Sequence, residues 1–288
     1  MPPPRRRAPP ASVPAPASPC GLSAVSGPPI RAARPGRGQG SGRGRRCGQP
    51  RRFLEQCAAF ESTPTGSPSM ATIAILGGTG DLGTGLAIRW SRAGHRIVIG
   101  SRTLEKAQAA VAALKEISPE TPAEAMENAD AAAAGEIVVL TVPFAHQIST
   151  LETVKAHLTG KILVDVTVPL VPPKVKTVQL PEGGSAAKAA QEFLGEEVMV
   201  VSAFQNISAE LLKDPDLHIE CDVLVAGNKK DARQTVIDLA REAGMTAWHV
   251  GPIANSAAAE ALTSLLIHIN GQGEISHAGI KIVGQDDH

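Results

Sequence analysis

The stretch Thr72-Ile-Ala-Ile-Leu-Gly-Gly-Thr-Gly-Asp-Leu-Gly83 is the most informative part of this sequence. Its first five residues have the apolar, β-branched character of a buried strand, and the glycines behind them precede an amphipathic helix. The spacing Gly78-x-Gly80-x-x-Gly83 is typical of a turn that binds the pyrophosphate of a dinucleotide. The first glycine permits the tight turn, the second admits the phosphates, and Gly83 lets helix and strand pack closely. The alternative is a structural glycine turn in an α/β protein that binds another ligand.

A second stretch, Gly100-Ser-Arg102, lies about twenty residues further on, where the next strand is expected to end. Enzymes that use NAD usually carry an Asp or Glu here for the ribose 2′-hydroxyl, whereas an Arg suits a 2′-phosphate. Lys106 follows one helical turn after Arg102, and a bound anion would relieve the repulsion between the two cations. We therefore expect Ser101, Arg102 and Lys106 to bind the 2′-phosphate of NADP(H). The alternative is a solvated basic pair that Glu105 neutralises.

The segment Leu140-Thr-Val-Pro-Phe-Ala-His146 follows another predicted core strand. Ligands of open α/β sheets bind beyond the carboxyl ends of the strands, where the strand order reverses. We therefore expect Val142, Pro143 and Phe144 to form a wall of the nicotinamide pocket, with His146 beside it. His146 is the titratable candidate nearest this pocket, but we expect a solvated ring at a helix N-terminus rather than an acid or base.

Short β-branched runs alternate with alanine-rich helical stretches from Met70 to the end of the chain. This pattern predicts an α/β protein, a Rossmann-type, doubly wound and mostly parallel sheet with a small C-terminal α/β portion. Strands are expected at 72–76, 96–100, 137–142, 161–166, 198–203, 221–226 and 246–250. Helices are expected at 82–93, 103–116, 124–133, 146–157, 184–194, 230–243 and 256–270. A third strand between 117 and 125 is expected to be very short.

The composition changes sharply near Met70. Residues 1–69 contain 14 of the 23 prolines and 11 arginines but only two acidic residues, which predicts a disordered extension. Its net charge of about +9 is opposed by about −9 on the remaining chain. We expect an NADP-binding Rossmann domain at 70–200 and a smaller portion at 201–288 that completes the pocket for a second cofactor.

Three interpretations of the extension stay open: a transit peptide, a basic tail that contacts nucleic acid or anionic lipid, and dispensable sequence before a true start at Met70. We favour the last. No apolar run has the length of a secretory signal or a membrane span, and we expect neither a membrane nor a nucleic acid as partner of the folded domain. Cys221 is the only cysteine after Met70, which is typical of a protein of the reducing cytoplasm.

The residue types that the chain lacks limit the catalytic schemes it can use. The chain contains no tyrosine, which excludes the Tyr–Lys scheme of short-chain dehydrogenases. Gly183-Gly-Ser-Ala-Ala-Lys188 faintly resembles a β-hydroxyacid dehydrogenase helix, but that motif needs an Asn where this chain has Glu192. The sequence indicates no metal cluster and no evident residue for proton transfer. A hydride acceptor that carries its own chemistry needs mainly proximity and orientation.

Taken together, these segments resemble the NADPH-dependent coenzyme F420 reductases. The likeness covers essentially all of 70–284, and its motifs follow the order of that family. Those motifs are Leu76–Gly83, Gly100–Arg102 with Lys106, Leu140–His146, Val201-Ser-Ala-Phe204, Gly251-Pro252 with Asn255-Ser256, and Gly279–Lys281.

The resemblance implies hydride transfer between C4 of NADPH and C5 of the deazaflavin of F420, usually in a homodimer. From the residues themselves we expect a cytoplasmic protein without a catalytic acid or base. The resemblance also implies that the pyrophosphate side is contacted by Thr79, Gly80, Asp81 and Leu82. It implies that the deazaflavin is lined by Ile207, Ala209, Ala278 and Gly279.

Two features depart from the family. Some members have His-Thr where this chain has Gln205-Asn206, and the segment 273–279 is longer than the equivalent tail. Two other functions therefore stay open: an NADPH-dependent flavin, ferric or imine reductase on the same nucleotide-binding domain, and a non-enzymatic NADP-binding sensor or scaffold.

Overall fold

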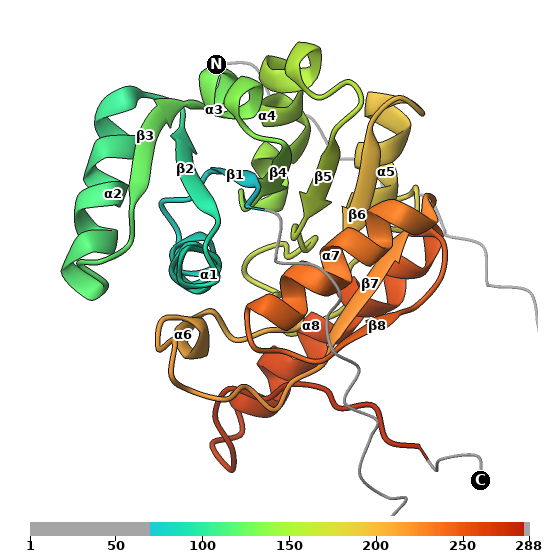
Figure 1. Ribbon diagram of the computed structural model, residues 1–288. Coiled ribbons are helices and arrows are strands. Elements are labelled where there is room, and N and C mark those ends of the chain that lie inside the picture. The colour runs from blue at the N-terminus through green and yellow to red at the C-terminus, as the bar shows by residue number, and fades with distance from the viewer. Residues whose placement is uncertain (1–69, 285–288) are drawn as a thin grey trace, which may run out of the picture. The chain divides into compact units, whose positions relative to one another are not determined.

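The computed structural model describes residues 70–284 (Figure 1). The expectations for residues 1–69 lie outside the described residues. The strands are β1 (Thr72–Leu76), β2 (Arg96–Ser101), β3 (Ala123–Glu127), β4 (Ile137–Leu140), β5 (Ile162–Asp165), β6 (Met199–Ser202), β7 (Val223–Gly227) and β8 (Ala247–His249). The α-helices are α1 (Asp81–Arg92), α2 (Leu104–Ile117), α3 (Asn128–Ala134), α4 (Gln147–Val154), α5 (Ala186–Leu194), α6 (Ala209–Leu212), α7 (Lys230–Glu242) and α8 (Ser256–Asn270). Short 3₁₀ turns lie at Phe144–His146, Lys155–His157 and Ile253–Asn255.

The eight strands form one sheet in the order β3-β2-β1-β4-β5-β6-β7-β8. All neighbouring strands run parallel except β6 and β7, which are antiparallel. The expected doubly wound, mostly parallel α/β fold is confirmed. The sheet continues from β6 into β7 without a break, and the proposed domain division at residue 200 stays a prediction.

Apolar side chains cover both faces of the central strands, as parallel sheets require. Along β1, Ile73 and Ile75 belong to the core that packs against α1, α2 and α7. Ala74 and Leu76 belong to a second core, packed against α3, α4 and α5. This continuous apolar run is what made β1 recognisable in the sequence.

The expected helix at 124–133 was wrong in its first half. Residues 123–127 form the edge strand β3, which pairs with β2, and the helix α3 begins only at Asn128. The sequence Ala-Glu-Ala-Met-Glu favours a helix by propensity, but hydrogen bonding to β2 outweighs that weak preference. The third strand, expected to be very short and to lie between 117 and 125, instead has five residues, as many as β1, and lies mostly in what the sequence assigned to the following helix.

Helix α1 is joined to the second half of the chain by a buried arginine. The guanidinium of Arg89, which is 5% exposed, donates hydrogen bonds to five backbone carbonyls. Burial lowers its pKa, but an arginine stays charged at any physiological pH. The five acceptors are the carbonyls of Leu211, Leu212, Asp214, Leu217 and Ala243.

Gly85 permits this contact. A Cβ built on Gly85 would collide with Leu212 of α6, so the two helices meet only because α1 lacks a side chain there. The segment 209–217 is consequently held against α1 at a distance that no larger residue allows.

A buried carboxylate holds α8 to the start of α5. Glu260, which is 1% exposed, accepts hydrogen bonds from the backbone amides of Ala186 (2.7 Å) and Ala187 (3.1 Å). Ser256 donates to Ser185, the N-cap of α5, at 2.7 Å. Removal from water raises the pKa of Glu260 to about 7, although the two amides favour the charged form.

Gly85→Ala tests the close approach of α1 and α6. Alanine normally stabilises a helix interior relative to glycine, but here its Cβ would overpack the contact with Leu212. We expect the free energy of unfolding to fall by about 1–3 kcal/mol. Urea denaturation of the full chain measures it, with Thr84→Ala in the same helix as control. A Gly85→Ala protein as stable as the wild type would contradict the close approach.

Glu260→Gln tests the buried carboxylate through the pH dependence of stability. Because the pKa of Glu260 lies above its ordinary value of 4.5, the folded state holds this proton more tightly than the unfolded state. Its contribution is full below pH 4.5 and is lost as the pH rises through about 7. The decrease in unfolding free energy from pH 5 to pH 8 should therefore shrink in the variant, on the order of 2–3 kcal/mol.

Denaturant titrations at several pH values measure this change. Glu192→Gln, at an exposed carboxylate on α5, is the control and should keep the wild-type pH profile. Equal pH dependence in the wild type and Glu260→Gln would mean that Glu260 titrates normally.

Candidate functional site

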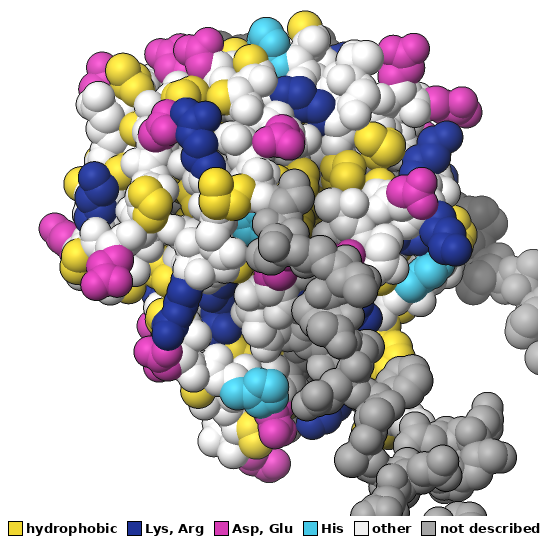
Figure 2. Space-filling model, in the orientation of Figure 1, with side chains coloured by type: hydrophobic (Ala, Val, Ile, Leu, Met, Phe, Trp, Pro, Cys, Tyr) yellow, Lys and Arg dark blue, Asp and Glu magenta, His cyan; other side chains and the backbone are white. Residues whose placement is uncertain are grey.

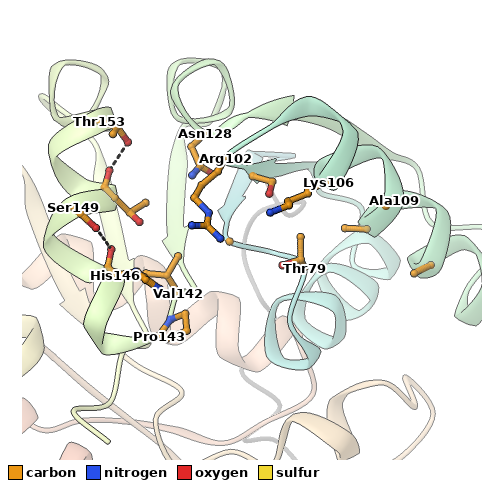
Figure 3. A pocket seen from close by; sticks show the side chains of 15 residues that line it. Thr79, Arg102, Lys106, Ala109, Asn128, Val142, Pro143, His146, Ser149 and Thr153 are labelled. Carbon is orange, nitrogen blue, oxygen red and sulfur yellow. Dashed lines mark hydrogen bonds between the residues drawn. The ribbon is translucent and has the colours of Figure 1, made fainter. Parts of the chain in front are cut away.

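A cavity of about 770 Å³ lies at the point where the strand order reverses (Figure 3). The strand β1 lies between β2 and β4, and the cavity is lined by residues that follow or end these three strands, by Asn128 after β3, and by residues of α2 and α4. Ligands of such sheets bind at this place. The cavity brings together seven residues predicted from the sequence: Thr79, Ser101, Arg102, Lys106, Val142, Pro143 and His146.

The glycine turn at the floor of the cavity is shaped by close backbone contacts. Gly77 has φ +72°, and a Cβ on it would lie 2.5 Å from Val142 Cγ1. A Cβ on Gly83 would lie 2.9 Å from the Cα of Gly78, which is the close packing that the motif predicted. Around Gly80, by contrast, no atom lies within 4 Å of such a Cβ. The turn is therefore closely packed at Gly77 and Gly83 and open at Gly80, where phosphates would bind. Helix α1 begins directly after it, at Asp81.

The basic end of the cavity is formed by the end of β2 and the start of α2. Ser101 is buried, whereas Arg102 and Lys106 are exposed, and in Figure 3 both basic side chains reach into the cavity. Glu105 does not neutralise them: within residues 70–284, no ion pair involves Arg102 or Lys106. Hydrogen bonds to its own backbone amide and to Thr103 lower the pKa of Glu105. The two cations thus remain available to an anion.

Asn128 lies beside Arg102 in the cavity wall and was missed by the sequence analysis (Figure 3). Its side chain is 8% exposed, and its Oδ1 has no hydrogen-bond partner among the described residues. A buried acceptor without a partner at a cavity wall indicates a site built for a ligand or water. The signal was hidden because Asn128 was placed inside a helix, whereas it directly follows the strand β3.

The opposite wall is formed by the segment after β4. Val142 and Pro143 line it, whereas Phe144, also expected here, begins a 3₁₀ turn and is not among the lining residues. His146 ends that turn with its side chain exposed, as expected for a solvated ring at a helix start. Gln147 anchors this wall, because its buried amide donates to Asp165 Oδ2 at 2.5 Å and to the Ala186 carbonyl at 3.0 Å. Burial raises the pKa of Asp165, which lies at the end of β5 and is fully buried.

The residues expected at a deazaflavin lie apart from this cavity and come from two segments. Ile207 is buried just before α6, and Ala209 begins that helix. The adjoining Ser208 Oγ lies 2.8 Å from Nδ1 of His277, which precedes Ala278 and Gly279. The structure therefore brings the segments 207–209 and 277–279 together.

Gln205 and Asn206, the departures from the family pattern, point into the protein. The Gln205 amide donates to the Asp165 carbonyl and to Ser202 Oγ, each at 2.8 Å. The Asn206 amide donates to the Ala259 carbonyl of α8 at 2.8 Å. Both side chains are anchors for the segment that carries Ile207 rather than walls of a pocket.

Residues 70–284 carry charged side chains of both signs on their surface. Basic and acidic side chains are interspersed on the face shown in Figure 2, rather than gathered by sign. Among these residues, no group of His, Cys, Asp and Glu side chains is arranged to hold a metal ion. None of their helices combines the length and apolar character needed to cross a bilayer.

Comparisons with known proteins place the chain in a family. A family model described as "NADP oxidoreductase coenzyme F420-dependent" matches residues 72–169. The F420-dependent NADP reductase of Methanocaldococcus jannaschii is 42% identical over 218 residues, which cover 73% of this chain and 97% of that protein. The corresponding reductase of Methanothermobacter thermautotrophicus is 38% identical over 217 residues, which cover 73% of this chain and 94% of that protein.

A solved structure extends the similarity to the fold. The crystal structure of a protein from Arthrobacter sp. FB24, described as a candidate F420-dependent NADP reductase, matches with a TM-score of 0.63 and 27% sequence identity. The match covers 75% of this chain and all of that one. The resemblance inferred from the motifs is confirmed, and the chain belongs to the family of F420-dependent NADP reductases.

Proposed function

We propose that this protein transfers a hydride between NADP(H) and coenzyme F420. The observation that carries this proposal is the cavity at the strand-order reversal, with Arg102 and Lys106 reaching into it from one end and Val142 and Pro143 lining the other. Two F420-dependent NADP reductases match this chain over nearly the whole of their own length, which supports the same acceptor here.

The residues present fit a phosphorylated dinucleotide. The open side of Gly80 and the amides at the start of α1 suit a pyrophosphate. Ser101, Arg102 and Lys106 suit a 2′-phosphate, since charge-assisted hydrogen bonds from a guanidinium or an ammonium to phosphate are among the strongest in proteins. The unpartnered Oδ1 of Asn128 is available to a donor on the adenosine part.

When both are bound, the nicotinamide and deazaflavin rings would supply the hydride chemistry, one ring as donor and the other as acceptor. The residues of this chain bind and orient the two rings, and a juxtaposition of that kind removes several kcal/mol from the barrier (about 7–11 kcal/mol in well-oriented intramolecular reactions). His146 is the only histidine among the residues that line the cavity, and its side chain is exposed to solvent. We therefore assign no catalytic acid or base.

We also propose that the second ring binds against Ile207, Ala209, Ala278 and Gly279, and that the protein is a cytoplasmic homodimer. The hydrogen bond between Ser208 and His277 supports the first part, because it unites the two segments involved. Exposed Leu265 and Ile269 on α8 suit a subunit contact. The reduced, buried thiol of Cys221 suits a reducing compartment.

Mixing the protein with NADPH and F420 tests the acceptor. We expect the absorbance and fluorescence of the oxidised deazaflavin to fall as it is reduced. Turnover with FMN, ferric complexes or imines but not with F420 would instead make the protein one of the alternative reductases. Tight NADPH binding without turnover of any of these acceptors would favour a sensor or scaffold.

Arg102→Ala tests the choice of dinucleotide. Loss of the guanidinium removes charge-assisted bonds that only the 2′-phosphate receives. We expect the Kd of NADPH to rise about a hundredfold, which corresponds to ~2.7 kcal/mol, and the Kd of NADH to change little. Titration calorimetry with both dinucleotides measures the difference. Equal losses for NADPH and NADH would refute the assignment.

His146→Ala tests the absence of acid–base catalysis. Because an exposed ring at a helix start contributes at most to the pocket wall, we expect kcat to fall less than about tenfold, whereas a general acid contributes 10²–10⁴-fold. Steady-state rates with saturating NADPH and F420 measure this. A thousandfold loss of kcat would identify His146 as a catalytic residue.

A further inference from the structure

Lys213 connects the glycine turn to the segment proposed for the second ring. Its ammonium lies 2.8 Å from Asp81 Oδ1 and 3.2 Å from Glu210 Oε2. Asp81 is the first residue of α1 and part of the glycine motif, whereas Lys213 directly follows α6. The ion pair with Asp81 therefore links two parts of the chain that are more than a hundred residues apart in sequence.

The backbone of Lys213 is held in place from both sides. Arg89 binds the carbonyl of the preceding residue, Leu212, at 3.0 Å, and it also binds that of the following residue, Asp214. The side chain of Lys213 is 24% exposed, and that of Asp81 is 71% exposed. The lysine is thus the fixed partner of the pair, and Asp81 is the partner open to solvent.

Asp81 creates an electrostatic conflict at the glycine turn. A carboxylate in the first turn of a helix is favoured by the helix dipole when no ligand is present. The same helix end is the place where a pyrophosphate binds, and its negative charge would be repelled by a nearby carboxylate. Lys213 supplies the opposite charge, and its ordinarily high pKa is raised further by hydrogen bonds to Asp81 and Glu210.

Resting on the proposed function, we propose that Lys213 is a positioning residue that neutralises Asp81 and so allows the dinucleotide pyrophosphate to bind at the start of α1. Lys213 acts through Asp81 rather than by touching the ligand. Lys213 lies in the same segment as Ile207 and Ala209. The positive charge that favours NADP(H) binding therefore comes from the segment proposed to bind the second ring.

Binding of NADPH to charge variants of the full chain tests this role. Lys213→Gln leaves Asp81 uncompensated, and we expect the Kd of NADPH to rise about tenfold. In Lys213→Gln/Asp81→Asn the repelling charge is gone, and the Kd should return to within about threefold of the wild type. In Lys213→Gln/Glu210→Gln the charge on the turn remains, and the Kd should stay close to that of the single variant. Fluorescence titration with NADPH measures all four proteins.

Two further readouts separate this role from a structural one. The effect of Lys213→Gln on Kd should shrink when the salt concentration is raised from about 0.05 to about 0.5 M, because exposed charges are then screened. The melting temperature should stay within about 4 °C of the wild type, since exposed ion pairs contribute little to stability. Lys188→Gln, at the lysine paired with Glu192 at 3.1 Å, is the matched control and should bind NADPH normally.

The outcomes distinguish this inference from the proposed function. An unchanged Kd in Lys213→Gln, while the wild type binds NADPH, would overturn the role of Lys213 alone. A double variant with Asp81→Asn that binds as weakly as Lys213→Gln would also overturn it, because the lysine would then act by direct contact or through the fold. A wild-type protein that does not bind NADPH would overturn both the role of Lys213 and the proposed function.

Discussion

The buried guanidinium of Arg89 is the interaction on which the arrangement of the two candidate subsites depends. A charge that is 5% exposed is costly unless it is fully hydrogen-bonded, and here five carbonyls accept from it. Four of them belong to the segment 211–217, which has only one short helix of its own. Because the arginine lies on α1, that segment takes its position from the helix whose first residues form the glycine turn.

At the candidate dinucleotide subsite, close contacts between backbone segments fix the structure, as Arg89 does for the segment 211–217. Gly77 lies against Val142, and Gly83 lies against Gly78, so the turn, the start of α1 and the segment after β4 fix one another without intervening side chains. Such a site loses little conformational entropy when a ligand binds, because its backbone groups are already in place. The long basic side chains of Arg102 and Lys106 remain exposed, so their ordering accompanies ligand binding.

The sequence predicted the strands and turns around the cavity well and the contacts between distant segments less well, for physical reasons. Strand β1 and its glycines have a local signature that requires a particular backbone, and the helix 256–270 was predicted with the bounds that the structure has. Strand β3 has no such signature, since its pairing with β2 overrides a helical propensity, and that error concealed Asn128. The contacts of Arg89 and Lys213 join residues far apart in sequence, and no local sequence pattern predicts such contacts.

The backbone after β6 explains how this chain accommodates Gln205 and Asn206. Phe204 has φ +71°, a conformation that costs a bulky residue about 1–3 kcal/mol. Its ring is 2% exposed and packs edge-on against Trp90 of α1, with centroids 5.8 Å apart and planes at 79°. Burial of a phenylalanine and an aromatic pair of this geometry offset such a cost. The resulting turn directs both amide side chains into the protein, where they donate hydrogen bonds to the backbone carbonyls of Asp165 and of Ala259 in α8. The amides of Gln205 and Asn206 thereby tie the segment that leads to Ile207 to β5 and α8.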